Sequence, residues 1–296
     1  MHGDLTGELV PIWGDASLLI DILDVRPSPD GSYTSLTRAG GSRSVVEGSQ
    51  MLGQAIVAAG RHCPGRRVVS AHMVFVRTAA DTEPLTFALT DLSSGRTFSS
   101  LRVEVTQGDR LCASGNLLLD RTADDVIRHQ VEPPEVPGPA ECEPLDMRVT
   151  GRDIRVADGA YSGDPDAPVG PPIIDAWVRF DSVPSDPCVH TALLAQFTGH
   201  MSIAAALRPH RGFGQDQAHR TLSTAINAIS MSLHRDVRAD RWMLYHHRST
   251  FAGDGMTHSE CRVHGEDGTL LASFTVDAMV RGFEGVAGNI PEKAVL

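Results

Sequence analysis

A histidine interrupts an apolar stretch of the chain that contains no acidic side chain. The stretch Val189–Leu207 is rich in alanine and leucine, and His200 lies in it close to Thr198 and Ser202. An imidazole titrates near pH 6.5 and can act as a general base, while hydroxyl and amide groups can hold a water molecule in place. We therefore predict that His200, Thr198 and Asn227, on a strand expected to cross this stretch, are catalytic. The alternative is that His200 is an ordinary core or surface histidine.

Most well-known catalytic and metal-binding patterns are missing from the sequence. It contains no Gly-x-Ser-x-Gly, His-Glu-x-x-His or Gly-x-Gly-x-x-Gly pattern and no P-loop. His246 and His247 are adjacent, but neighbouring strand residues point to opposite faces, so we expect no shared metal ion. The 5 cysteines are scattered and odd in number, which is typical of neither a disulfide framework nor a zinc site. We expect no metal ion and no cofactor.

The charge balance of the chain argues against nucleic acid as a partner. The 296 residues include 37 acidic and 26 basic side chains, for a net charge of −11, whereas a nucleic-acid binder needs a basic face to replace phosphate counterions. No apolar stretch approaches the ~18 residues of a transmembrane helix. The N-terminus lacks the basic segment and apolar core of a secretory signal. We expect no nucleic-acid partner, no membrane partner and a cytoplasmic location.

The elements that must position these side chains follow from apolar spacing. In the first half, residues 49–61 place Met51, Ala55 and Ala59 on one helical face. Runs typical of strands follow at 68–77, 85–92, 98–106 and 111–119. The second half repeats this order, with one long helix predicted over Val189–Leu207 and strands at 222–234, 242–250, 257–264 and 270–280.

Three short blocks match between the two halves at nearly constant offsets. Residues 72–77 match 230–235, residues 102–103 match 262–263, and residues 111–114 match 270–273, at offsets of 158, 160 and 159 residues. Matching blocks in the same order of elements predict tandem copies of one unit. We therefore predict an α+β fold in which each half is a long central helix wrapped by an antiparallel β-sheet.

A proline-rich stretch separates the two halves. Proline fixes φ and removes a hydrogen-bond donor, so the stretch is typical of a linker rather than of packed structure. We predict an N-terminal domain over 1–120, a linker over 121–171 that crosses the surface without a long helix, and a C-terminal domain over 172–296.

Short motifs relate the whole chain to a known family. They are GSQxxGQA at 48–55, FVR at 75–77, LRPH at 207–210, LHR at 233–235, WMLY at 242–245 and DGxLLAS at 267–273. In these motifs and their order, the sequence resembles the acyl-CoA thioesterase II proteins, in which one chain holds a tandem, or double, hotdog fold.

The resemblance implies an acyl-CoA pocket between two central helices and hydrolysis of the thioester by an oriented water. In the family an aspartate, a Ser or Thr, and a glutamine orient that water. Here the aspartate position falls on Gly199, the hydroxyl position on Ile226 near Thr224, and the glutamine position on Val276 beside Asp277. Because none of the three replacements is polar, we expect weak or absent hydrolysis of ordinary acyl-CoA.

Small and polar residues around these positions are the expected contacts of a substrate. Gln50 and Gln54 could line the pocket from the first helix, or could be polar-face glutamines. Gly199 removes a side chain and could open space for a ligand, or could merely allow close packing of its helix. The full predicted substrate-binding set is Gln50, Gln54, Gly199, Ser202, Thr224 and Val276.

Two functions stay open from the sequence. The first is a thioesterase-like protein of fatty acid metabolism, which binds an acyl thioester between the two helices and hydrolyses it to acid and thiol. The second is a catalytically degenerate or repurposed protein that binds an apolar acyl or polyketide-like molecule, or catalyses a non-hydrolytic conversion. The expected partner is acyl-CoA or a carrier-bound acyl thioester, and by resemblance the chain could form a homodimer.

Overall fold

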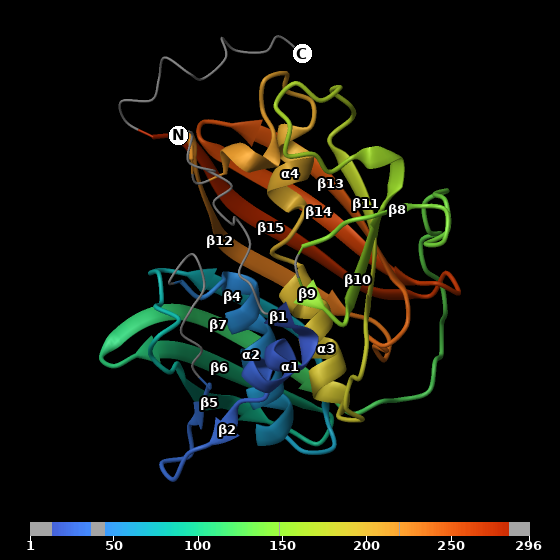
Figure 1. Cartoon of the computed structure of the whole chain (residues 1–296). Coiled ribbons are helices and arrows are strands. Elements are labelled where there is room, and N and C mark those ends of the chain that lie inside the picture. The colour runs from blue at the N-terminus through green and yellow to red at the C-terminus, as the bar shows by residue number, and fades with distance from the viewer. Residues whose placement is uncertain (1–13, 37–44, 148, 219, 284–296) are drawn as a thin grey trace.

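A long antiparallel sheet wraps around helices in this computed structural model (Figure 1). The structure describes residues 14–36, 45–147, 149–218 and 220–283. Within these residues 13 strands form one sheet in the order β2-β3-β5-β6-β7-β4-β12-β15-β14-β13-β11-β10-β8. Helices α2 and α3 lie side by side in its interior. The architecture is α+β with a helix inside each half of the sheet, as predicted.

The first unit is built on the predicted helix and strands. Its central helix is α2 (Gly48–His62), in which every residue from Ser49 to Gly60 is buried. A short helix not foreseen from the sequence, α1 (Ala16–Leu23), packs against α2 and α3. The strands of this unit are β2 (Arg26–Pro27), β3 (Tyr33–Thr34), β4 (Arg67–Phe75), β5 (Thr86–Ser94), β6 (Phe98–Gln107) and β7 (Arg110–Asp120).

The second unit repeats the helix and the four long strands. Its helices are α3 (Pro187–Phe197) and α4 (Ser202–Leu207). Its long strands are β12 (Leu222–Leu233), β13 (Met243–Gly253), β14 (Met256–Gly265) and β15 (Leu270–Gly282), with β11 (Ile173–Phe180) beside β13. The 3-10 helices η1 (Ala157–Gly159) and η2 (Gln215–Gln217) lie in its connections.

The two units meet through β4 and β12, which pair antiparallel at the middle of the sheet. In this pairing Ser230 lies opposite His72, and His72 Nδ1 is 2.7 Å from Ser230 Oγ. These residues are equivalents in the sequence repeat. A position that faces its own equivalent lies on a two-fold axis, so the chain has the internal symmetry of a dimer of like subunits.

Helices α2 and α3 approach so closely that glycines are needed along their contact. A Cβ atom on the glycine of each contacting pair would lie under 3.0 Å from an atom of the partner residue. The pairs are Gly199 with Ser49, Gly53 with Ala192, and Gly60 with Cys188. Because the numbers rise along α2 and fall along α3, the two helices run antiparallel.

The single long helix predicted over Val189–Leu207 is wrong. α3 ends at Phe197, and α4 begins at Ser202. Between them Met201 adopts a left-handed φ of 66°, which no residue inside a right-handed helix can have. Residues 199 and 200 therefore lie outside α3 and do not continue the helical face of Gln196.

Part of the proline-rich stretch 121–171 is packed structure. It contains β8 (Glu143–Pro144), β9 (Val149–Thr150) and β10 (Arg152–Val156). β10 pairs with β11 and buries Arg152, Ile154 and Val156, while β9 pairs with β1 (Gly14–Asp15). The prediction of a wholly unpacked linker is wrong here, because alternate residues of β10 complete the second core. The domain boundaries themselves stay a prediction.

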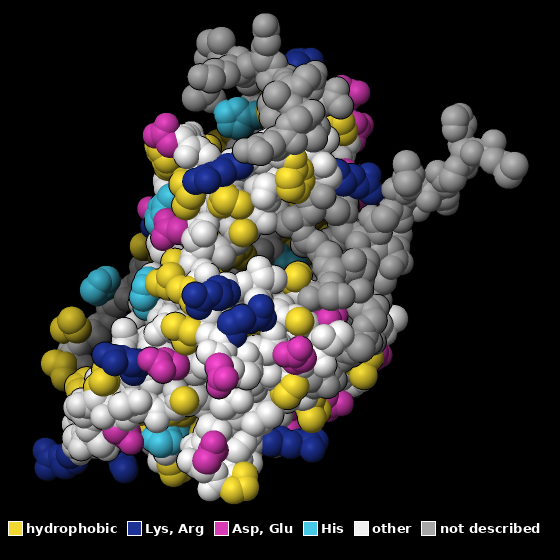
Figure 2. Space-filling model, turned by 90° about the vertical axis from the view of Figure 1, so that its left-hand side faces the viewer, with side chains coloured by type: hydrophobic (Ala, Val, Ile, Leu, Met, Phe, Trp, Pro, Cys, Tyr) yellow, Lys and Arg dark blue, Asp and Glu magenta, His cyan; other side chains and the backbone are white. Residues whose placement is uncertain are grey.

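The surface carries charges of both signs. On the face in Figure 2, acidic and basic side chains are interspersed with hydrophobic ones, without a broad basic area among the residues described. In the part of the chain that the structure describes, no helix is both long and apolar enough to span a membrane.

The contact between α2 and α3 can be tested at Gly53. A valine there would force atoms against the Ala192 carbonyl oxygen and Leu23, so Gly53→Val should lower the free energy of unfolding by about 1–3 kcal/mol. Chemical denaturation measures this value. Gly138→Val is the control, because its Cβ would meet only a Glu141 side-chain oxygen at 3.9 Å. Equal stability of the two variants would contradict the close approach.

Candidate active site

The break between α3 and α4 holds the predicted histidine. His200 follows the last turn of α3, where its ring stacks on Phe197 with centroids 4.7 Å apart. Thr198 Oγ1 donates a hydrogen bond to the Ala195 carbonyl oxygen at 2.6 Å, so its hydroxyl is already engaged at the helix end. Met201 holds its strained φ directly after His200. Non-glycine residues in this region cost about 1–3 kcal/mol and gather at functional sites.

Burial sets the protonation state of His200. Burial lowers the pKa of His200 to about 3, and the positive charge of Arg152 acts in the same direction. His200 is therefore neutral at pH 7 and a weak proton acceptor. Its Nδ1 atom is buried without a hydrogen-bond partner among the described residues, so the ring can still accept or donate a hydrogen bond to a ligand. Its role as a catalytic base stays a prediction.

Gly199 does not open a cavity, because neighbouring residues fill the space that its side chain would occupy. A Cβ atom there would clash with Ser49 Oγ and would lie 3.2 Å from Ile226 Cδ1. The structure therefore brings two of the three positions inherited by resemblance, Gly199 and Ile226, into contact. These contacts favour the interpretation that Gly199 allows close packing. Its packing partners lie on both α2 and β12.

A β-bulge on β12 lies at Asn227, directly after Ile226. The register of β12 against β15 shifts between Ile226 and Ala228, which leaves Asn227 as the extra residue. Its Oδ1 atom is buried and has no hydrogen-bond partner in the described part of the chain. Bulges commonly re-aim a side chain beside a functional site. Val276, the third inherited position, is buried on the neighbouring strand opposite Ile229.

The glutamines expected to bind substrate occupy different environments. Gln54 Nε2 donates to the Ile22 carbonyl oxygen at 2.9 Å, and thus connects α2 to α1. Gln50 is buried on α2 next to Ser49. A third glutamine, Gln196, is buried in the last turn of α3. Its Nε2 lies 3.5 Å from a Glu47 carboxylate oxygen, and its Oε1 has no partner among the described residues.

Ser202 and Thr224, the remaining predicted contacts, are both buried. Ser202 Oγ lies 3.3 Å from His247 Nδ1, and the Ser202 carbonyl oxygen accepts a hydrogen bond from Ser259 Oγ at 3.1 Å. Burial lowers the pKa of His247 to about 3. This contact fixes the start of α4 against β13 and β14.

Arg152 was missed by the sequence reasoning. It extends from the first residue of β10 to the end of α3, where its guanidinium carbon lies 5.8 Å from the centre of the Phe197 ring. Burial lowers the pKa of Arg152 to about 10, while Glu47 favours its charge. The sequence does contain a pattern that could have found Arg152. Arg152, Ile154 and Val156 alternate along the chain, so in a strand they share one face, which places a cation among apolar side chains.

The residues described offer no metal site, since no three of their His, Cys, Asp or Glu side chains are grouped to hold an ion. What the arrangement offers is a set of buried groups able to bind a polar ligand. Hydrogen-bond partners are absent from the described residues for Ser49 Oγ, Gln196 Oε1, His200 Nδ1, Asn227 Oδ1 and all three Arg152 nitrogens.

Two like units, each an antiparallel sheet around a central helix and joined edge to edge, define a double hotdog protein. A model of the acyl-CoA thioesterase N-terminal domain matches residues 38–119, and a model of the acyl-CoA thioesterase C-terminal domain matches residues 124–280. Together these matches span most of the sequence. The chain belongs to the acyl-CoA thioesterase family.

Individual relatives agree with this assignment. The chain is 24% identical over 308 residues to acyl-coenzyme A thioesterase 8 of Mus musculus, with 95% of this chain and 92% of the relative covered. It is 26% identical to the Homo sapiens protein of that name, with coverage of 79% and 80%. The acyl-CoA thioesterase II TesB2 structure from Mycobacterium marinum superposes with a TM-score of 0.75 at 24% identity, covering 90% and 99%. At this identity the superposition shows the fold.

Because Ser49 fills the space beside Gly199, substitutions at the two positions should have coupled effects on stability. Gly199→Ala should destabilise the protein by about 1–3 kcal/mol, because its Cβ meets both the Oγ and the Cβ of Ser49. Adding Ser49→Gly should restore much of that loss, since it removes both atoms. Denaturation of both single variants and the double variant gives the coupling energy. Additive effects would show that the two residues do not compete for this space.

The buried histidines predict a loss of stability in acid. The pKa of His247 is about 3 in the folded state and ~6.5 in the unfolded chain. The contribution of His247 to the free energy of unfolding is therefore complete above pH ~6.5 and is lost as the pH falls toward 3. His247→Gln should therefore reduce the stability difference between about pH 7.5 and about pH 4.5 by on the order of 2 kcal/mol. His129→Gln, at an exposed position, is the control. An unchanged pH dependence in His247→Gln would contradict the depressed pKa.

Proposed function

We propose that the chain binds an acyl thioester between α2 and α3 and hydrolyses it to an acid and a thiol beside the break between α3 and α4. Family membership supports thioester hydrolysis as the class of reaction. The relatives are named as acyl-CoA thioesterases, which supports CoA as the carrier, with a carrier protein as the alternative. The cytoplasmic location and the homodimer stay predictions.

The observation that carries this proposal is the group of buried polar atoms without partners at the α3–α4 break. They are contributed by α2, α3, β10, β12 and the break itself. Buried polar atoms are nearly always hydrogen-bonded, because leaving one unpaired costs about 1–3 kcal/mol. Several such atoms beside a strained residue and a β-bulge support a site that a ligand or its water completes.

The proposed reaction assigns roles that fit these groups. Asn227 Oδ1 and Gln196 Oε1 are acceptors that can orient an attacking water toward the thioester carbonyl carbon. A C–O bond then forms, the C–S bond breaks, and the departing sulfur takes a proton that the water loses. Neutral His200 can pass that proton by hydrogen bonding, whereas Thr198, engaged with Ala195, positions the break.

One observation favours a second candidate, a repurposed protein that binds the thioester or an apolar acyl or polyketide-like molecule without hydrolysing it. Gly199, Ile226 and Val276 bring no polar side chain to the positions that orient water by resemblance, and Ser49 fills the space beside Gly199. Loss of a general base commonly costs about 10²–10⁴ in rate. Slow hydrolysis is therefore expected even under the first proposal.

Asn227→Ala tests the proposed site. Because Asn227 is assigned to hold water rather than substrate, the variant should release thiol from acyl-CoA with a kcat lowered about 10²-fold, while KM changes little. Asn116→Ala is the matched control, since Asn116 is exposed on β7. Thiol release is followed with a thiol-reactive dye.

Two outcomes would contradict the proposal. Equal kcat in the Asn227→Ala variant and the wild type would show that Asn227 and its bulge do not belong to the site. Tight binding of acyl-CoA with no thiol release by the wild-type protein would instead support the repurposed, non-hydrolytic candidate.

A further inference from the structure

The proposed hydrolysis needs a group that takes a proton from the attacking water. His200 serves this role poorly, because burial lowers its pKa to about 3. The amide oxygens of Asn227 and Gln196 accept hydrogen bonds but do not take up a proton near neutral pH. Residues 187–215, which include α3, the break and α4, contain neither Asp nor Glu. A carboxylate that acts as the base must therefore reach the break from another element.

Glu47 brings a carboxylate to the end of α3. It is the N-cap residue of α2, and its Oε2 lies 3.5 Å from Nε2 of Gln196 in the last turn of α3. Ser49, two residues further along, meets Gly199 just after α3 ends. The first turn of α2 thus lies against the end of α3 and the start of the break. Because Glu47 is partly exposed, water can reach its side chain.

The contact with Gln196 places this carboxylate beside the proposed position of the attacking water. Nε2 and Oε1 of Gln196 belong to one planar amide, and the proposed function assigns Oε1 to orient that water. A carboxylate 3.5 Å from Nε2 is therefore also near the water. Geometry of this kind, with the base close to the proton that it removes, is the first requirement for general-base catalysis.

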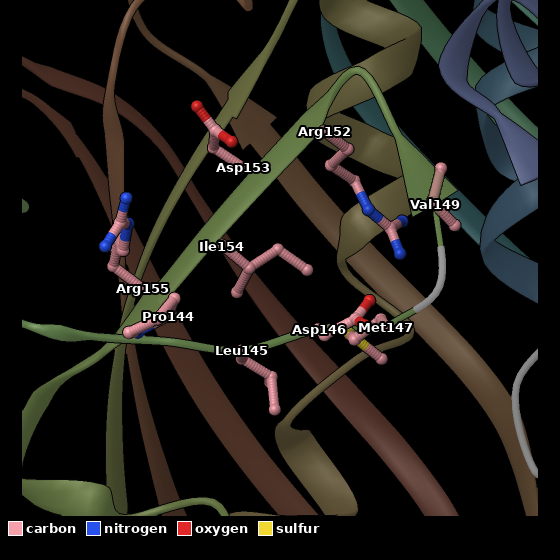
Figure 3. Close-up of a pocket in the computed structure, with 9 residues that line it drawn as sticks. All are labelled: Pro144, Leu145, Asp146, Met147, Val149, Arg152, Asp153, Ile154 and Arg155. Atoms are coloured by element: carbon pink, nitrogen blue, oxygen red, sulfur yellow. The ribbon is translucent and has the colours of Figure 1, made fainter.

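The charge of Arg152 helps to hold the carboxylate at this place. Arg152 extends from the first residue of β10, whereas the next residue, Asp153, points away from it (Figure 3) and is paired with Arg179 at 2.6 Å. Glu47 is the carboxylate whose charge favours protonated Arg152. The guanidinium lies over the Phe197 ring in the last turn of α3. Attraction between the opposite charges therefore draws the Glu47 side chain toward the end of α3.

The opposite end of the helix contact, related to this one by the internal two-fold symmetry, offers a comparison. One shift of 139 residues relates the contact partners at the two ends, Ser49 to Cys188 and Gly60 to Gly199. The same shift relates Glu47 to Asp186, which is the N-cap residue of α3 as Glu47 is of α2. The two carboxylates thus occupy like positions in the two halves.

An ion pair at Asp186 marks the difference between the two ends. Its Oδ1 accepts a hydrogen bond from the Cys188 amide at 2.9 Å, and its Oδ2 lies 3.2 Å from Nη2 of Arg61. The shift that relates the two ends also relates Arg61 to His200, which is neutral at pH 7. A permanent cation thus holds the carboxylate at one end, whereas a neutral imidazole takes the like position at the other. This asymmetry favours Glu47 over Asp186 as a group that accepts a proton.

We propose that Glu47 is the general base of this reaction, an inference that rests on the proposed function. The Glu47 carboxylate takes a proton from the water as the water oxygen bonds to the carbonyl carbon of the thioester. When the C–S bond breaks, that proton passes to the departing sulfur. The products are an acid and a thiol, and Glu47 is ionised again.

Thiol release from hexanoyl-CoA tests the assignment in the full chain. Glu47→Gln removes the base but keeps the size of the side chain, so kcat should fall about 10²–10⁴-fold while KM changes little. Glu47→Asp should retain part of the activity. Asp186→Asn is the matched control, because it changes the equivalent carboxylate and asparagine also serves as an N-cap. Its kcat should equal that of the wild type.

Chemical rescue separates a base from a structural role. Sodium formate should restore part of the activity of Glu47→Ala, because a small carboxylate can occupy the space of the missing side chain and accept the proton. Sodium chloride at the same concentration should restore none. Circular dichroism and thermal melts of each variant show that it is folded.

The outcomes separate this inference from the proposed function. Wild-type kcat in Glu47→Gln would overturn the assignment of Glu47 and leave the proposed hydrolysis intact. A loss of kcat that formate does not restore, or an equal loss in Asp186→Asn, would also overturn the assignment, because it would indicate a structural role. Absence of thiol release by the wild-type protein would overturn the proposed function and this inference together.

Discussion

The close contact between α2 and α3 is the constraint on which the rest of the structure depends. Gly53 and Gly60 on α2, and Gly199 just after the end of α3, leave no room for a Cβ atom. Because each helix belongs to one of the two repeated units, this contact and the β4–β12 pairing together fix one unit against the other. The units share one sheet and one apolar core, so neither helix can shift without disturbing both.

The same contact explains where the polar groups collect. Gly199, two residues after the end of α3, meets Ser49 at the start of α2, and the chain continues through His200 and the strained Met201 into α4. On β12 the bulge at Asn227 directly follows Ile226, which lies beside Gly199, and from β10 the side chain of Arg152 reaches the Phe197 ring at the end of α3. Positions 199, 226 and 276 carry no polar side chain, whereas neighbouring elements contribute buried polar atoms without partners among the described residues.

Much of the fold was predictable from the sequence, whereas the centre of the site was not. Strands β4 to β7 and β12 to β15 follow from alternating apolar residues, and the offset between the halves predicts two copies of one unit. The pairing of the equivalent residues His72 and Ser230 was seen only in the structure. The break after Phe197 was missed because the stretch 189–207 is mostly apolar, and the end of the helix depends on packing between distant residues. Arg152 was missed because its burial depends on the pairing of β10 with β11. Local spacing carries neither kind of information.

A crystal structure with the thioether analogue of hexanoyl-CoA tests the central claim most directly, because it locates the atoms that replace the thioester. The account predicts the sulfur beside the break between α3 and α4, with Asn227 within ~3.5 Å of the atoms that replace the thioester. An analogue bound elsewhere on the sheet, with the α3–α4 break still unoccupied, would contradict it.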